Sequence, residues 1–333
     1  MQAFFYNLFT PDRCCAVIEG DAPVAAGYLI PAGNLVVEAH KTPCAMIYAV
    51  ASLPEHRNRG YGTTVVRELI TVAHSDGYPA VVLCPSDDSL FEFYSVRAGF
   101  RDWFYLSEQR FDGFTNTCPR DNRRCETLRP ATRQKKLNSE VFPPANHISR
   151  LHETGPGEYS LLREKLLSGI PHIEYDQCML SYQSVICREY GGGLFKIETD
   201  YGTSCAVVEA PPDGPVAVKE LLSPGPHDSG SPQLHDSDSP QLNGSDSPQL
   251  NGSCTPETAA LSEIAAAFPA DKYIVRTPAR ESSAGTAKPN STHATANTAC
   301  PNTRRFGMLA VPDCRFASIN GRNASPWYGL AFD

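Results

Sequence analysis

A short turn rich in glycine and arginine, residues 57–62, stands directly before a helix-like apolar pattern. Gly60 and Gly62 would let the backbone approach a ligand closely, while Arg57 and Arg59 bring positive charge to the same turn. A helix that begins there presents unpaired backbone N–H groups and the positive end of its dipole. A phosphate group is therefore the expected ligand. A plain tight turn would carry the same residues, so the turn alone does not establish a phosphate site.

The elements that would position this turn follow in a regular order. An apolar run over residues 46–53 predicts a buried strand, and the apolar positions of 63–74 recur at helical spacing. Residues 79–84 predict a second apolar strand, 89–97 predict a helix with N-cap side chains before it, and 100–106 predict a further strand. The turn is therefore expected at the junction between a buried strand and a helix.

The rest of the chain also alternates strands and helices. This alternation predicts an α/β or α+β class with a mixed sheet in each half. Further strands are expected at 14–19, 24–29, 35–39, 148–151, 194–198, 205–209, 216–222, 273–277, 306–311 and 327–332, with a turn at 31–34, and further helices at 158–167, 175–190 and 256–268.

Shifts in composition divide the chain. We expect a first domain over 1–112, a linker rich in Pro, Asn, Arg and Thr over 113–145, and a second domain over 146–333. Within the second domain, 223–254 contains an eight-residue tandem repeat that begins Ser-Pro-Gln-Leu, and 279–304 is a polar loop. A repeat of this composition cannot bury a core, so it is expected to be a disordered insertion.

Residues 52–62 resemble the pyrophosphate-binding motif R/Q-x-x-G-x-G/A of the Gcn5-related N-acetyltransferase (GNAT) superfamily. Arg57, Gly60 and Gly62 fill its fixed positions. A second landmark follows about 40 residues later, where an aromatic pair that ends in Tyr94 precedes Gly99-Phe100. The resemblance covers the first 112 residues and implies a GNAT-like fold there.

The resemblance also implies an activity and a set of site residues. The activity is transfer of an acetyl or other acyl group from the coenzyme A thioester to an amine, with Tyr94 as general acid to the departing thiolate. Backbone groups of the buried strand would pair with the pantetheine arm, and amides of the turn would hold the pyrophosphate. The cofactor contacts are then Val50, Ala51, Ser52, Arg57, Asn58, Arg59, Gly60, Tyr61, Gly62 and Thr63.

The sequence departs from the family pattern at several points. Residues 1–9 are all that precede the first strand, where the family has a strand and two helices that line the acceptor pocket. The spacing from Tyr94 to Gly99 is five residues, against the usual four, so Tyr94 could instead be an aromatic packed under the sheet. Glu38 is the one side chain considered as a general base on a neighbouring strand.

The second half resembles a degenerate copy of the same fold. Residues 158–190 correspond to the two opening helices and 216–222 to the buried strand. The tandem repeat stands where the pyrophosphate turn would follow, and no R/Q-x-x-G-x-G/A occurs there. We therefore expect two tandem copies of which the first alone binds acetyl-CoA.

The amino-acid composition restricts the classes of binding partner that we expect. The 333 residues have 41% hydrophobic and 20% charged residues and a net charge of −8, which favours neither nucleic acid nor an anionic membrane. The 12 cysteines are scattered without ligand spacing, so we expect reduced thiols and no metal. With no signal peptide and no membrane-spanning run, a cytoplasmic location is expected.

Two other functions fit parts of the sequence. A non-catalytic acyl-CoA-binding or protein-interaction module would account for the short N-terminus and the shifted Tyr94. A P-loop or dinucleotide-binding protein fits less well, because no G-x-x-x-x-G-K-[ST] is present and Gly62 is followed by Thr63-Thr64-Val65 rather than by a third glycine. The expected acceptor is a small-molecule or peptide amine, and the sequence specifies neither which amine nor the oligomeric state.

Overall fold

The computed structural model describes residues 2–112, 150–225, 255–279, 302–312 and 326–329. Three of the predicted features lie wholly or largely outside this described part. They are the linker at 113–145, the repeat insertion at 223–254, of which 226–254 lie outside, and the polar loop at 279–304, of which 280–301 lie outside.

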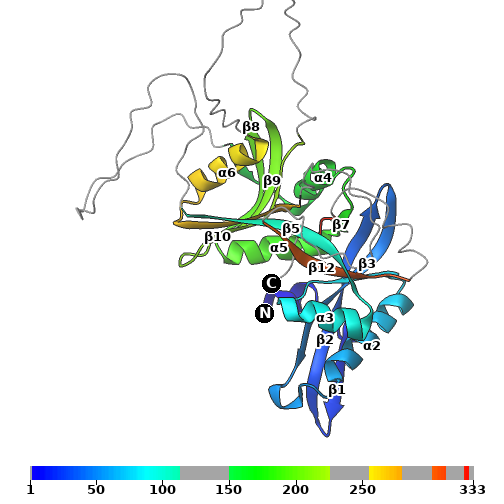
Figure 1. Ribbon diagram of the computed structural model, residues 1–333. Helices are drawn as coiled ribbons and strands as arrows, with labels where there is room; N and C mark the ends of the chain where they lie inside the picture. The colour runs from blue at the N-terminus through cyan, green and yellow to red at the C-terminus, as the bar shows by residue number, and fades with distance from the viewer. Residues whose placement is uncertain (1, 113–149, 226–254, 280–301, 313–325, 330–333) are drawn as a thin grey trace, which may run out of the picture.

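One mixed sheet contains the twelve strands of the described residues (Figure 1). Its order is β1-β2-β3-β4-β12-β5-β11-β10-β9-β8-β6, and β7 pairs with β2. The strands are β1 (Cys14–Glu19), β2 (Ala22–Val37), β3 (His40–Ser52), β4 (Ala80–Leu83), β5 (Arg101–Asp112), β6 (Leu151–Glu153), β7 (His172–Tyr175), β8 (Gly193–Thr199), β9 (Gly202–Glu209), β10 (Val216–Leu222), β11 (Lys272–Pro278) and β12 (Thr303–Ala310).

Helices cover both faces of this sheet. The α-helices are α1 (Gln2–Asn7), α2 (Tyr61–Ser75), α3 (Asp88–Ala98), α4 (Pro156–Leu166), α5 (Gln177–Glu189) and α6 (Pro256–Ala267), with short 3-10 helices at Pro11–Arg13 and Pro54–His56. Apolar side chains of α2 and α3 pack on one face of β2, β3 and β4, while those of α1, α4 and α5 pack on the opposite face. The helix predicted at 256–268 is α6; its N-cap is Thr255, whose hydroxyl accepts the Thr258 N–H at 3.1 Å.

The sheet is continuous from the N-terminal to the C-terminal half of the chain. β12, which comes from the end of the sequence, lies between β4 and β5 and is antiparallel to both. The second part of β5 pairs with β11. We expected a mixed sheet in each half, and the structure instead joins the strands of both halves into one.

The two halves repeat one order of pairing. In the first half β3 and β4 are parallel and α2 connects them. In the second half β10 and β11 are parallel, and α6 lies between them in sequence. Each parallel pair follows a set of antiparallel strands, as the resemblance to a doubled fold implies.

The predicted break at residues 31–34 is wrong, because β2 runs through it as one strand. The register shifts between Pro31 and Gly33, so the chain takes up the proline in a β-bulge without leaving the sheet. Gly33 is paired on both sides, with Cys44 of β3 and Tyr175 of β7. A Cβ on Gly33 would overlap the carbonyl oxygen of Glu174, which explains why glycine is needed where the two backbones meet.

A buried ion pair connects α4 to β10. The Nε of Arg163 donates to the Glu220 carboxylate at 3.0 Å, and the two side chains are 1% and 0% exposed. The Tyr159 hydroxyl and the Trp327 indole N–H donate to the same carboxylate, at 2.7 and 2.6 Å. The Nη1 of Arg163 also donates to the Ile173 carbonyl at 2.6 Å. Glu220 therefore joins a helix, a strand and the segment around Trp327 in the interior.

Candidate active site

The strands β3 and β4 separate at their C-terminal ends. Their parallel pairing runs only from Cys44 to Met46 on β3, opposite Ala80 to Val82 on β4. Beyond Met46, β3 continues to Ser52, while β4 keeps its pairing with β12 as far as Leu83. The backbone edge of β3 after Met46 is therefore not used by β4 and faces a wedge between the two strands.

The strand β3 is distorted where it borders this wedge. Between Tyr48 and Ala51 it holds one more residue than β2 holds opposite them, which makes a β-bulge. Ala49 has a φ of 51°, in the left-handed region that a non-glycine residue rarely adopts. The predicted pantetheine contacts Val50, Ala51 and Ser52 follow this bulge, on the part of β3 that β4 leaves unpaired.

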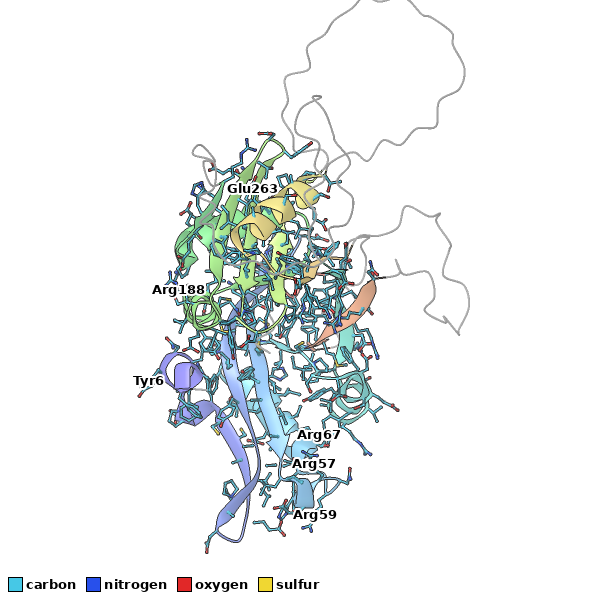
Figure 2. The ribbon with its side chains drawn as sticks, turned by 90° about the vertical axis from the view of Figure 1, so that its left-hand side faces the viewer. Tyr6, Arg57, Arg59, Arg67, Arg188 and Glu263 are labelled. Carbon is cyan, nitrogen blue, oxygen red and sulfur yellow. The ribbon has the colours of Figure 1, made fainter. Side chains whose placement is uncertain are left out.

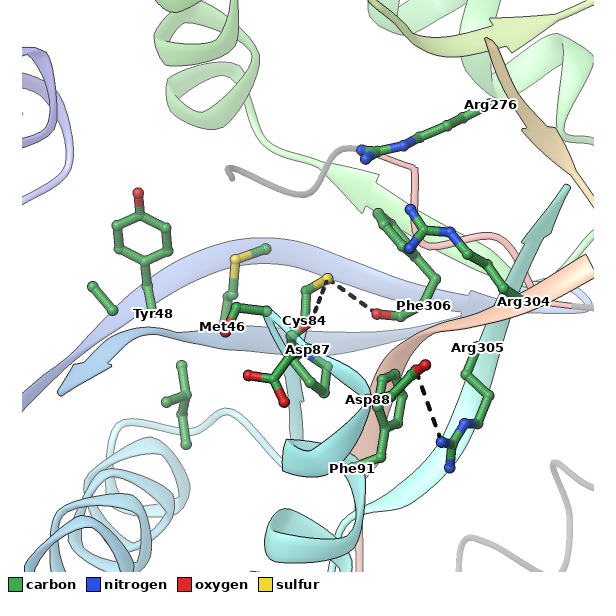
Figure 3. Close-up of a pocket in the computed structure, with 14 residues that line it drawn as sticks. Met46, Tyr48, Cys84, Asp87, Asp88, Phe91, Arg276, Arg304, Arg305 and Phe306 are labelled. Atoms are coloured by element: carbon green, nitrogen blue, oxygen red, sulfur yellow. Dashed lines mark hydrogen bonds and ion pairs between the residues drawn. The ribbon is translucent and has the colours of Figure 1, made fainter. Parts of the chain in front are cut away.

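A pocket of about 540 Å³ occupies the wedge (Figure 3). Met46 and Phe306 line it from the face covered by α1, α4 and α5, and Ile47 and Phe91 from the face covered by α2 and α3. The pocket therefore reaches through the sheet from one face to the other. The Cys84 thiol donates to the Phe306 carbonyl at 3.0 Å and joins the end of β4 to β12 at the pocket wall.

The predicted phosphate turn lies at the N-terminus of α2, next to the end of β3. Gly60 is the N-cap residue with a φ of 86°, and no side chain caps the helix. A Cβ on Gly62 would lie 3.7 Å from the Ser52 hydroxyl and 3.7 Å from the Phe93 ring. The first amides of α2 thus sit between β3 and α3, and a Cβ on Gly60 would meet nothing within 4 Å.

Arginine side chains surround the beginning of α2. Figure 2 shows Arg57, Arg59 and Arg67 at the same end of the molecule. The guanidinium of Arg59 lies 3.6 Å from the carboxylate of Glu19, which also accepts a hydrogen bond from the Tyr61 hydroxyl at 3.2 Å. Arg57 and Asn58 are exposed in the turn. The structure therefore brings the predicted cofactor contacts from Val50 to Thr63 together at one end of the wedge.

Tyr94 lies on α3 and is buried, with 8% of its surface exposed. Its ring packs against Phe93 and Phe100, with centroids 5.1 and 6.1 Å apart. Burial, followed by the charges of Asp87 and Cys84, raises the pKa of Tyr94 to about 12. Tyr94 therefore packs in the apolar layer under the sheet. Asp87 and Cys84 line the pocket, whereas Tyr94 itself is not one of the lining residues.

Two aspartates stand at the N-terminus of α3, in the pocket lining. Asp87 is the N-cap and accepts the Ser89 backbone N–H at 2.9 Å. Hydrogen bonds from the Ser89 hydroxyl and from backbone N–H groups hold the pKa of Asp87 below its ordinary value, so this carboxylate is a weak base. Glu38, considered as a base from sequence, lies at the turn between β2 and β3 and does not line the pocket.

Three pocket arginines were missed by sequence reasoning. Arg276 comes from β11, and Arg304 and Arg305 come from β12. The only local signal was the pair Arg304-Arg305 before an apolar strand, and nothing in the sequence indicates that this strand lies beside β4. Tyr48 also lines the pocket, although its place in an apolar run favoured a core position.

Metal and membrane features were searched in the part of the chain that the structure describes. No group of three or more His, Cys, Asp or Glu side chains there could hold a metal ion. None of the helices in that part is long and apolar enough to cross a membrane.

Comparison with known proteins assigns the N-terminal part. Residues 1–100 match the family model described as an acetyltransferase (GNAT) domain. Among curated proteins, no sequence matches the chain. A solved structure from Enterococcus faecalis V583, described as a conserved protein of unknown function and a probable N-acyltransferase, is 10% identical, with a TM-score of 0.51 over 93% of this chain and 64% of that one.

Two other solved structures are similar. A GCN5-related N-acetyltransferase from Kribbella flavida is 14% identical, with a TM-score of 0.48 over 91% of this chain and 61% of its own. A GNAT family acetyltransferase from Brucella melitensis, solved in complex with acetyl-CoA, is 18% identical, with a TM-score of 0.22 over 26% of this chain and 52% of its own. This chain thus spans 61% and 64% of the Kribbella and Enterococcus proteins.

The fold of this chain is the GNAT fold. Within it, residues 1–100 are a GNAT acetyltransferase domain, and the mixed sheet continues this fold into the C-terminal half.

Proposed function

We propose that this protein transfers an acetyl group from acetyl-CoA to the amine of an acceptor, at the wedge between β3 and β4. The observation that carries the proposal is the arrangement within the GNAT domain. The unpaired edge of β3 leads from the pocket directly to the uncapped N-terminus of α2.

The residues present fit coenzyme A. An extended arm can add to the free edge of β3 as an extra strand does, through backbone hydrogen bonds. The pyrophosphate suits the first amides of α2, where no acidic residue occupies the first turn. Arg57 and Arg59 add positive charge beside these amides, and the open space at Gly60 leaves room for phosphate oxygens.

The reaction requires one proton to leave the amine and another to reach the sulfur. When bound, acetyl-CoA supplies an activated thioester. The amine nitrogen forms a bond to its carbonyl carbon, and the carbon–sulfur bond breaks. We assign the donation of a proton to the departing sulfur to Tyr94, as the resemblance to the GNAT motif implies; its phenol, like that of an ordinary tyrosine, is protonated at neutral pH. The lowered pKa makes Asp87 a weak base, and the amine proton is proposed to leave to water.

Calorimetric titration with acetyl-CoA tests the cofactor site without knowledge of the acceptor. We expect one equivalent to bind per chain, since the α2 turn occurs once in the described residues. Absence of binding would contradict the proposal.

Replacing Tyr94 by phenylalanine tests the proton donor. We expect turnover to fall about tenfold with the KM for acetyl-CoA unchanged, since a thiolate of ordinary pKa leaves slowly but measurably without a donor. Tyr78→Phe is the control, because Tyr78 packs near Arg13 outside the pocket. An unchanged rate in Tyr94→Phe would remove this residue from the mechanism.

The second candidate function is a non-catalytic acyl-CoA-binding module, which the packed position of Tyr94 favours. Binding of acetyl-CoA without turnover on any amine would support this second function.

A further inference from the structure

The pocket has one side left for the acceptor. The α2 turn and Phe91 lie on the face covered by α2 and α3, where the cofactor is proposed to enter. On the opposite face the pocket is bounded by Met46, Phe306 and two arginines, Arg276 and Arg304. Side chains on this face are therefore in position to contact an acceptor.

Arg276 and Arg304 share one carboxylate with a third arginine. The Nε of Arg276 and the Nη2 of Arg304 donate to the same oxygen of Glu108, at 3.2 and 2.6 Å. Arg110 binds the other oxygen at 3.1 Å. Burial alone would raise the pKa of Glu108, but Arg304, Arg110 and Arg276 outweigh it and hold the pKa below the ordinary value. Three guanidinium groups thus meet one carboxylate.

The two pocket arginines are held in fixed positions. Both guanidinium groups lie over the Phe306 ring, with Arg276 at 5.4 Å and Arg304 at 6.0 Å from its centroid. The side chain of Arg276 is 14% exposed and that of Glu108 is 11% exposed, so solvent screens this charge less than it screens a surface charge. A planar guanidinium that is already oriented binds a carboxylate with little loss of conformational freedom.

Negative charge gathers on a different part of the same pocket. Asp87 and Asp88 line it at the start of α3, and Figure 3 shows them apart from Arg276 and Arg304. Arg305, which lines the same pocket, lies 3.9 Å from Asp88 and balances its charge, so the ammonium group of a ligand would face Asp87. A ligand with an ammonium group at one end and a carboxylate at the other would match this separation of charge.

We propose that the acceptor is a small amino acid, an amine that carries a carboxylate, and that Arg276 and Arg304 bind the carboxylate. This inference rests on the proposed acetyl transfer at the same pocket. The volume of about 540 Å³ is in the range of small-molecule sites. The acetylated end of the cofactor shares this volume, so the acceptor is small.

The test compares amino acids with their neutral amides. Release of free coenzyme A thiol is measured with glycine, β-alanine, 4-aminobutyrate and 5-aminopentanoate, and with the carboxamide of each. We expect kcat/KM for at least one acid to exceed that of its amide by about tenfold or more, because a charge-assisted hydrogen bond is lost with the amide.

Two matched variants assign this preference to the pocket. Arg304→Gln is expected to lower the ratio of acid to amide about tenfold, and Arg304 is 49% exposed, so its replacement should leave the fold intact. Arg110→Gln removes the same charge from the same Glu108 but lies outside the pocket lining and is 76% exposed. For Arg110→Gln, the ratio of kcat/KM for the acid to kcat/KM for the amide is expected to equal that of the wild type.

The outcomes separate this inference from the proposed function. Equal kcat/KM for acids and amides, an equal effect of Arg110→Gln and Arg304→Gln, or acetylation of a diamine such as putrescine but of no acid would overturn the amino-acid acceptor and leave acetyl transfer standing. Binding of acetyl-CoA with no acid or amide acetylated would also overturn it. Failure to bind acetyl-CoA in calorimetry would overturn the proposed function itself, and this inference with it.

Discussion

Replacing Glu220 by glutamine is expected to lower the free energy of unfolding by about 3–5 kcal/mol. The change removes the buried carboxylate that the Nε of Arg163 meets at 3.0 Å and leaves the 1% exposed guanidinium with only the partly exposed Glu164, 3.3 Å from its Nη1. Glutamine keeps the size and one oxygen for Tyr159 or Trp327, so the loss measures the uncompensated charge rather than a cavity. Urea unfolding of the full chain, followed by tryptophan fluorescence, measures the change.

A surface carboxylate on β8, which β9 separates from β10, is the matched control. Glu198 pairs with Lys196 at 3.2 Å and is 56% exposed, so Glu198→Gln is expected to change the free energy of unfolding by less than about 0.5 kcal/mol. Adding Arg163→Met to Glu220→Gln removes the buried charge and is expected to recover part of the loss. Equal stability of the Glu220 and Glu198 variants would show that the buried pair contributes nothing beyond a surface pair.

Replacing Gly62 by aspartate is expected to weaken acetyl-CoA binding at least about thirtyfold, or about 2 kcal/mol. The new carboxylate would occupy the first turn of α2 and repel the pyrophosphate from the amides there. The fold should survive, because a negative charge at a helix N-terminus is favourable and the Cβ has ordinary 3.7 Å contacts with Ser52 and Phe93. Calorimetric titration with acetyl-CoA gives the affinity.

Thr71→Asp provides the control for net charge. Thr71 lies on the same helix, nearly three turns after its N-terminus, is exposed, and its hydroxyl donates to the Arg67 carbonyl. The same added charge there is expected to leave the affinity within about twofold, since the helix-terminus effect is confined to the first turn. Unchanged affinity in Gly62→Asp would place the phosphate elsewhere.

The segment from residue 46 to residue 100 could be predicted because its signals are local. The apolar run of β3, the uncapped Gly60 and the Asp87 cap each mark an element or a boundary with adjacent residues. The predicted helices begin within two residues of α2 and α3. The position of the Tyr94 side chain could not be predicted from residue spacing alone. Its packing against residues such as Phe100, just before β5, decides whether the phenol faces the pocket or the core.

What could not be predicted depends on pairing across long stretches of sequence. β5 extends to Asp112, beyond the predicted end at 106, because its second part pairs with β11 although its own residues are polar. Glu108 and Arg276 are 168 positions apart. Such contacts leave no periodic pattern in the sequence. The part of the pocket lined by Arg276 and Arg304 therefore could not be predicted.

The position of β12 sets the order in which the protein can fold during synthesis. Cys84 and Phe306 are hydrogen-bonded at the pocket wall although 222 positions separate them. Until Thr303–Ala310 has left the ribosome, β4 and β5 have no strand between them, and each keeps an open edge. The GNAT domain therefore stays incomplete until β12 has been synthesised, although its own sequence emerges about 200 residues earlier. Its nascent form is expected to depend on chaperones, because its pocket is completed only when β12 is in place.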